Sequence, residues 1–187
     1  MRIFAYDPTA LFLMSNRLTR IRYLYEKELY TLASNFITHG LEVLGPNHEL
    51  SYASACTLRG LVELDTLNAE KALGSFQEGF AVRERLLPAN DAFIASSLNA
   101  ISLAHTELGQ LAKAQETGDR AIQIRRETQS DRIGNSYSNM ASTLLRMGKH
   151  EEAEVMLAQC PSLKDFTDET FLSSGNPRFA GYVHLQL

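Results

Sequence analysis

Hydrophobic and polar positions follow the three- and four-residue steps of an α-helical face over most of the 187-residue chain. The clearest pattern predicts one helix over 92–108 and a second over 111–126. Between them stands Gly109, a residue type that commonly ends a helix by adopting a left-handed backbone conformation. We therefore expect two antiparallel helices joined by a short turn. The apolar face of the first helix consists of Leu98, Ile101, His105 and Leu108.

This helix pair is one of several related copies. Each predicted second helix carries an alanine, and the four alanines are 39, 42 and 39 residues apart. Seven residues after each alanine, or about two helical turns, stands another small residue. Small side chains on one face let a neighbouring helix approach closely, so the chain is expected to be an array of packed helix pairs. The small-residue pairs are Ala33 and Gly40, Ala72 and Gly79, Ala114 and Ala121, and Ala153 and Cys160.

The predicted array does not begin or end cleanly. We expect an N-terminal segment with an irregular helix over 1–27, the repeat array over 28–164, and a linker with the start of a truncated further repeat over 165–187. Ala180 supports that last repeat because it lies 39 residues after Ala141. An array that stops within a repeat exposes an apolar face, which a longer array, the tail of the chain or a partner would cover. End-to-end self-association is one expected consequence.

One inner turn lacks a glycine. Leu67 stands at the place that Gly109 occupies in the next pair. We expect Leu67 and Asn68 to form this turn, with Asn68 supplying the unusual backbone angles, since asparagine tolerates the left-handed region. Pro161 is expected to close the second helix of the last complete pair.

Two segments, LNAISLAHTELGQLAKAQETGDRAI and YSNMASTLLRMGKHEEAEVMLAQC, resemble the tetratricopeptide repeat (TPR). Residues 51–88 resemble it less closely, and residues 28–45 only in the second half of the unit. The spacing is longer than the TPR unit of about 34 residues. This longer period, with the Ile-Arg end of the second helix, is similar to the kinesin-light-chain type. The string AVRERLLPAND is more loosely similar to the TPR tails of fungal multidomain NLR-like proteins.

The resemblance implies an all-α fold, an α-solenoid of antiparallel helix pairs wound into a right-handed superhelix. The concave face of such a superhelix is lined by the first helix of each pair and binds an extended peptide or a partner's helix. The chain would then be a protein–protein interaction scaffold. The alternative function is a regulatory or sensor TPR segment of a larger signalling protein of the NLR-like type.

Side chains of the first helices that packing does not need would face this groove. Asparagine suits a peptide-binding groove because its amide group both donates and accepts hydrogen bonds. In kinesin-light-chain-like repeats, asparagines near the places of Asn99 and Asn139 hold the main chain of the ligand. The alternative is that both asparagines cap a helix, bond across the repeat interface or face solvent. The candidate groove residues are Ser96, Asn99, Leu103, Thr106, Asn135, Ser138, Asn139, Ser142 and Arg146.

Charge narrows the choice of partner. The formal net charge of −4 argues against nucleic acid, because phosphate binding depends on lysine and arginine. Five arginines could meet an acidic ligand or could form an ordinary solvated face. The mixed charges at 83–85 and 125–127 are typical of exposed helix ends. The five arginines are Arg59, Arg125, Arg126, Arg132 and Arg146.

The cellular compartment follows from what the sequence lacks. No apolar run is long enough to span a bilayer and no signal peptide is evident, so we expect no membrane partner. Cys56 and Cys160 are far apart and imply no disulfide framework, which fits a reducing compartment, and we expect the cytoplasm. Because Cys160 occupies a small-residue place in its repeat, we expect it to be a buried free thiol.

Motifs for catalysis are absent from the sequence. It contains no GxxxxGK[ST] phosphate loop, no HExxH, no CxxC and no GxSxG. The histidines are scattered, and His105 and His150 occupy core or turn places in the repeat, where packing explains them. We therefore expect no enzyme activity, no cofactor and no metal site, and a protein or peptide as the ligand.

Overall fold

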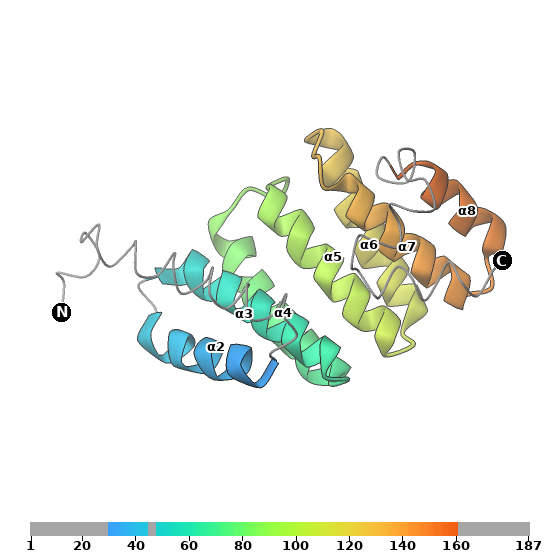
Figure 1. Ribbon diagram of the computed structural model, residues 1–187. Coiled ribbons are helices and arrows are strands. Elements are labelled where there is room, and N and C mark those ends of the chain that lie inside the picture. Colours follow the sequence, from blue (N-terminus) through green and yellow to red (C-terminus); the bar gives the residue numbers. More distant parts are fainter. Residues whose placement is uncertain (1–29, 45–47, 161–187) are drawn as a thin grey trace, which may run out of the picture.

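The computed structural model describes residues 30–44 and 48–160, and seven α-helices account for most of these ranges (Figure 1). They follow one another through a single stack with α2 at one end and α8 at the other. No strand occurs within the described ranges. The predicted all-α solenoid of antiparallel helix pairs is confirmed. The helices are α2 (Tyr30–Leu44), α3 (Glu49–Asp65), α4 (Ala69–Leu86), α5 (Ala92–Glu107), α6 (Leu111–Glu127), α7 (Ile133–Arg146) and α8 (His150–Ala158).

The helices form the pairs that the sequence predicted. α3 packs against α4, α5 against α6, and α7 against α8, while α2 packs against α3 as the second helix of a preceding pair. α5 and α6 end within one residue of the limits expected from the hydrophobic pattern. The segments 1–27 and 165–187, together with Ala180 and Pro161, lie outside the described residues, and α8 already ends at Ala158.

Helix ends follow from local sequence. Gly109 and Gly148 adopt φ angles of 70° and 75° in the turns after α5 and α7, a left-handed conformation that glycine reaches at little cost. The turn predicted at Gly109 is confirmed. α5 begins after Asp91, whose Oδ1 accepts a hydrogen bond of 2.7 Å from the amide of Phe93 and so satisfies one free amide of the first turn.

The turn after α3 differs from the prediction. The left-handed residue is Leu67, with φ 61°, whereas Asn68 has φ −107°. The amides of Leu67 and Asn68 donate to the carbonyl oxygens of Leu64 and Glu63 at 3.0 and 2.7 Å. This bonding pattern requires a left-handed residue directly after the helix cap, which is the place of Leu67 and not of Asn68. The prediction that Asn68 supplies the unusual angles is therefore wrong.

Small residues lie where helices approach closely. A Cβ on Gly79 of α4 would stand 2.8 Å from the carbonyl oxygen of Ala53 on α3, so only glycine fits there without a shift. Gly40 is different, because no described atom lies within 4 Å of its Cβ position. Close packing through Gly40 is thus not found among the described residues. The buried members of the predicted small-residue pairs are Ala72, Gly79, Ala114, Ala121, Ala153 and Cys160.

Two arginines lie inside the array. Arg83 and Arg125 are each 4% exposed, so the prediction that both belong to exposed helix ends is wrong. Arg83 donates to Ser97 Oγ at 2.7 Å, and Arg125 donates to Ser136 Oγ at 2.8 Å. A buried charge must be hydrogen-bonded, so each guanidinium ties a second helix to the first helix of the next pair. Burial lowers the pKa of both arginines.

Candidate binding surface on the first helices

Hydrogen bonds between side chains join α5 to α7. Ser136 Oγ donates to Asn99 Oδ1 at 3.0 Å, and the hydroxyl groups of Thr106 and Thr143 share a hydrogen bond of 2.7 Å. Farther along, Arg146 donates to the carbonyl oxygen of Thr106. These contacts fix the spacing of the two first helices, so polar side chains beside them have defined positions.

The structure leaves most predicted groove residues accessible. Asn135 and Arg146 are exposed, and the remaining candidates except Thr106 are half-buried. Thr106 is 1% exposed, and its hydroxyl also donates to the carbonyl oxygen of Ser102. The prediction that Thr106 lines the groove is wrong, because this side chain packs between α5 and α7. The half-buried candidates are Ser96, Asn99, Leu103, Ser138, Asn139 and Ser142.

Asn99 takes one of the roles left open by the sequence. Its Oδ1 accepts the hydrogen bond from Ser136 and so bonds across the repeat interface. Ser136 in turn accepts from Arg125, and Arg125 also donates to the carbonyl oxygen of Arg132 at 2.8 Å. Buried Arg125 thus orients the side chain of Asn99 through one serine. No hydrogen bond from the Asn99 amide nitrogen to another described residue is found.

Sequence reasoning missed this role of Arg125, although a signal was present. Arg83 and Arg125 are 42 residues apart, and each donates a longer bond of 3.4 Å to a serine of its own pair. These serines, Ser54 and Ser96, are also 42 residues apart. An arginine and a serine that recur together mark a recurring contact, and an exposed charged face gives no such pairing.

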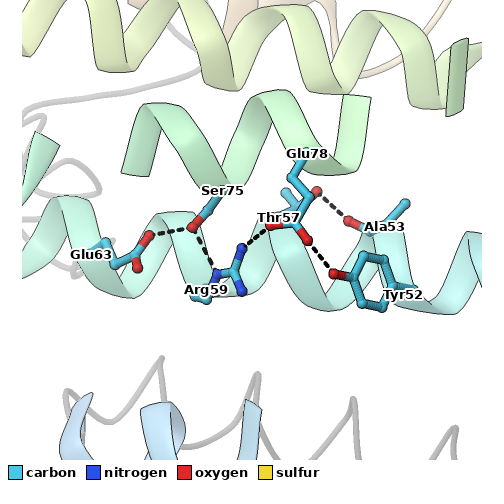
Figure 2. A network of polar contacts seen from close by, with 7 residues as sticks. All are labelled: Tyr52, Ala53, Thr57, Arg59, Glu63, Ser75 and Glu78. Atoms are coloured by element: carbon cyan, nitrogen blue, oxygen red, sulfur yellow. Dashed lines mark hydrogen bonds and ion pairs between the residues drawn. The ribbon is translucent and has the colours of Figure 1, made fainter. Parts of the chain in front are cut away.

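A network of polar contacts joins α3 to α4 (Figure 2). Glu78 of α4 accepts hydrogen bonds from Tyr52 and from Arg59, and Arg59 Nε donates to Ser75 Oγ at 2.8 Å. The Ser75 hydroxyl donates to Glu63 at 2.5 Å. The hydrogen bond to Glu78 raises the pKa of Tyr52 to about 12. Arg59 is therefore paired within the fold.

Two other arginines proposed for an acidic ligand also have partners within the fold. Arg146 lies 3.3 Å from Glu107 in an ion pair. Arg126 donates to Tyr137 Oη at 3.0 Å and lies over the tyrosine ring, with 5.6 Å between the guanidinium carbon and the ring centre. Of the five candidates, Arg132 is exposed and has no ion pair with another described residue.

His105 lies in the core and not on this surface. His105 is 7% exposed, and its Nδ1 lies 2.8 Å from Gln110 Oε1. This position agrees with the core place predicted for it. Within residues 30–44 and 48–160, no group of three or more potential metal ligands is found. None of the helices in these two ranges is long and apolar enough to cross a membrane.

A family model for the tetratricopeptide repeat matches residues 93–160, which correspond to α5–α8. This match and the helix pairs identify tetratricopeptide repeats within residues 93–160. Arg125, Asn99 and the turn glycines Gly109 and Gly148 all lie in the matched segment. No curated protein matches the chain. The looser similarity to NLR-like TPR tails stays a prediction.

Solved TPR structures share this fold at low identity. BtubC (BKLC) from P. vanneervenii superimposes with a TM-score of 0.71 at 16% identity, over 86% of this chain and 67% of that one. A candidate kinesin light chain of Podosopora anserina with nearly identical TPR-like repeats gives 0.68 at 15% identity, over 83% and 78%. The apo form of RapI gives 0.71 at 15% identity, over 86% and 58%. The predicted likeness to kinesin-light-chain repeats is therefore confirmed for the fold.

Proposed function

We propose that this chain is a protein–protein interaction scaffold whose first helices bind an extended peptide or a partner's helix. Proteins built of tetratricopeptide repeats generally bind protein partners, and the stacked repeats offer a long surface for contact. The observation that carries the proposal is the Asn99 side chain. Ser136, which accepts from Arg125, donates to its oxygen, and its amide nitrogen is left for a ligand carbonyl group.

Neighbouring side chains support the same surface. α7, whose Ser136 bonds to Asn99, carries further polar side chains at half-buried or exposed positions. They are Asn135, Ser138, Asn139 and Ser142. Their hydroxyl and amide groups match the alternating donors and acceptors of a peptide backbone. A role in holding a partner requires no catalytic group and no cofactor, and we propose a non-enzymatic role in the cytoplasm.

The test begins with capture of partners on the intact chain and mapping of the shortest bound peptide. Titration calorimetry then compares the wild type with the Asn99→Ala, Asn139→Ala double variant. We expect about tenfold weaker binding, as two hydrogen bonds of about 0.5–1.5 kcal/mol each are lost. Gln77→Ala, at an exposed position of α4, is the control and should bind normally. Unchanged affinity of the double variant, with a normal circular dichroism spectrum, would remove Asn99 and Asn139 from the site.

The alternative, a regulatory TPR segment of a larger signalling protein, predicts a different solution behaviour. A segment of a longer array has unmatched apolar ends, and it should associate end to end. Sedimentation of the chain over a range of concentrations distinguishes the two functions. A molecular mass that is independent of concentration favours the free-standing scaffold.

A further inference from the structure

Two buried arginines decide where four serines send their hydroxyl protons. Arg83 and Arg125 each donate to two serines, one at 2.7 or 2.8 Å and the other at 3.4 Å. A guanidinium group carries five N–H donors and no acceptor, so none of these serines can donate back to its arginine. Each hydroxyl proton therefore needs a different acceptor. The serines are Ser54 and Ser97 beside Arg83, and Ser96 and Ser136 beside Arg125.

Ser136 differs from the other three serines in its acceptor. The other three donate to the carbonyl oxygen four residues earlier in their own helix, at 2.9 or 3.0 Å. The carbonyl oxygen four residues before Ser136 belongs to Arg132, and it already accepts a hydrogen bond of 2.8 Å from Arg125. The Ser136 hydroxyl donates instead to Oδ1 of Asn99 on α5, at 3.0 Å. Arg125 thus occupies both the serine oxygen and the nearest backbone acceptor.

The proton from Ser136 fixes which end of the Asn99 amide group faces α7. A hydroxyl that donates must meet the amide oxygen, because the amide nitrogen is a donor only. Asn99 is half-buried, and its Nδ2 bonds to no other described residue. No buried side-chain nitrogen or oxygen in the described part of the chain lacks a partner, so Nδ2 must be accessible to solvent. Asn99 therefore offers its two N–H donors at the surface and keeps its oxygen bonded to Ser136.

The neighbouring pairs carry a hydroxyl at the place of Asn99. Thr57 lies 42 residues earlier and Ser138 lies 39 residues later, both half-buried on first helices. A hydroxyl group rotates and can present either its proton or its oxygen to a ligand. The amide group of Asn99, held by Ser136, presents donors in one fixed direction. Among these three places, Asn99 is the one with a defined hydrogen-bond polarity.

We propose that Arg125 is a positioning residue that makes Asn99 a donor-only contact for the ligand. The inference rests on the proposed binding surface on the first helices and states which ligand group is recognised there. Asn99 donates to a carbonyl oxygen of the ligand main chain and forms no hydrogen bond with a main-chain N–H group. The ligand class is an extended segment whose residue at Asn99 needs no amide proton, so proline fits at that place.

The orientation of the amide is measured without any ligand, by nuclear Overhauser effects (NOEs) in the full chain. In the wild type the NH₂ protons of Asn99 should give only a weak NOE to the β-protons of Ser136. Arg125→Met leaves Ser136 free to accept, so the amide can turn over and a strong NOE should appear. Ser136→Ala removes the same constraint and should give a strong NOE to the new methyl group, should Arg125→Met fail to fold. Ser97→Ala, the equivalent serine 39 residues earlier, is the matched control and should leave the NOE weak.

The donor role is tested with acetyl-hexaproline dimethylamide, a probe that carries carbonyl acceptors and no N–H group. Its addition should shift the NH₂ signals of Asn99 and the methyl signals of Leu103, which lies one helical turn later. Asn99→Asp keeps an acceptor for Ser136 but replaces the NH₂ group by an oxygen. It should weaken binding of the probe, followed at Leu103, by about twofold to tenfold. Gln77→Glu, at an exposed position of α4, makes the same change of charge and should bind the probe normally.

Each measurement has a result that contradicts the proposal. A strong NOE in the wild type would show the opposite orientation of the amide. A weak NOE in folded Arg125→Met and Ser136→Ala variants would remove Arg125 as the positioning residue. Hexaproline that leaves Asn99 unshifted, or that binds Asn99→Asp as tightly as the wild type, would exclude the donor role. The NOE requires no ligand, so a correctly oriented amide in a chain that captures no partner would refute the proposed function alone.

Discussion

Gly60 of α3 faces the ring of Phe76 of α4 so closely that a Cβ on Gly60 would collide with three ring carbons. In the next pair, 42 residues later, Ser102 and Gly118 take these two places, so the larger residue has moved to the other helix. A Cβ on Gly118 would lie 2.6 Å from the methyl carbon of Met140 on α7. The same contact is therefore filled by the second helix in one pair and by the first helix in the next.

Gly60→Ala is expected to lower the free energy of unfolding by about 1–3 kcal/mol, the usual cost of overpacking a core. Phe76 is 2% exposed, so its ring has little room to move away. Urea unfolding followed by circular dichroism measures the effect. Gly74→Ala is the matched control, because this α4 residue has open space around it and should gain about 0.5–1 kcal/mol. Equal effects of the two variants would show that the ring yields.

Arg125→Ala is expected to destabilise the fold by about 2–4 kcal/mol, since charge-assisted hydrogen bonds to Ser136 and to a backbone carbonyl are lost. Arg125→Met should cost less, because it keeps most of the volume and buries no charge. Ser136 still has Asn99 as a partner in both variants. Arg120→Ala, at an exposed position of α6, should change stability by less than about 0.5 kcal/mol. A loss for Arg125→Ala as small as for Arg120→Ala would contradict the buried role.

Arg125 also shows where reasoning from the sequence stops. Helix pairs, turns and small-residue contacts depend on residues close in sequence, and Gly109, Ala114 and Gly79 made them predictable. The burial of Arg125 depends on three helices meeting, with Ser96 on one and Ser136 on another. Its charge alone predicts that Arg125 is exposed to solvent, so the buried contact was missed.

The same limit affects the candidate surface. Thr106 has the polarity and spacing of a groove residue, yet the hydroxyl of Thr143 on the next first helix closes over it. Whether a polar residue lines the surface or is buried therefore depends on contacts between repeats, which the pattern within one repeat does not predict.

Alkaline pH should destabilise the protein through Cys56 and Tyr52. Burial raises the pKa of Cys56 from 9.0 to about 11, and the hydrogen bond to Glu78 raises that of Tyr52 from 10.0 to about 12. The folded state keeps both protons at a pH where the unfolded chain has released them. The stabilisation is therefore complete below pH 9 and is lost as pH rises towards 11 for Cys56 and 12 for Tyr52.

Variants separate the two groups. Urea unfolding at a series of pH values should show a shallower loss between pH 9 and 11 for Cys56→Ala than for the wild type. For Tyr52→Phe the loss should become shallower between pH 10 and 12. The slopes are compared rather than the absolute stabilities, because Cys56→Ala also removes a buried sulfur. Curves parallel to that of the wild type would show that neither group holds its proton in the folded state.

Leu67→Gly is expected to stabilise the protein by about 0.5–1 kcal/mol. Leu67 has φ 61°, a left-handed angle that costs an L-residue about 1–2 kcal/mol, part of which the greater chain entropy of glycine offsets. The side chain is 94% exposed, so its removal sacrifices little burial. The melting temperature should rise, and Gly109→Ala, the reverse change at the equivalent turn, should lower it. A fall in melting temperature for Leu67→Gly would show that the exposed leucine contributes a contact worth more than the strain of its backbone.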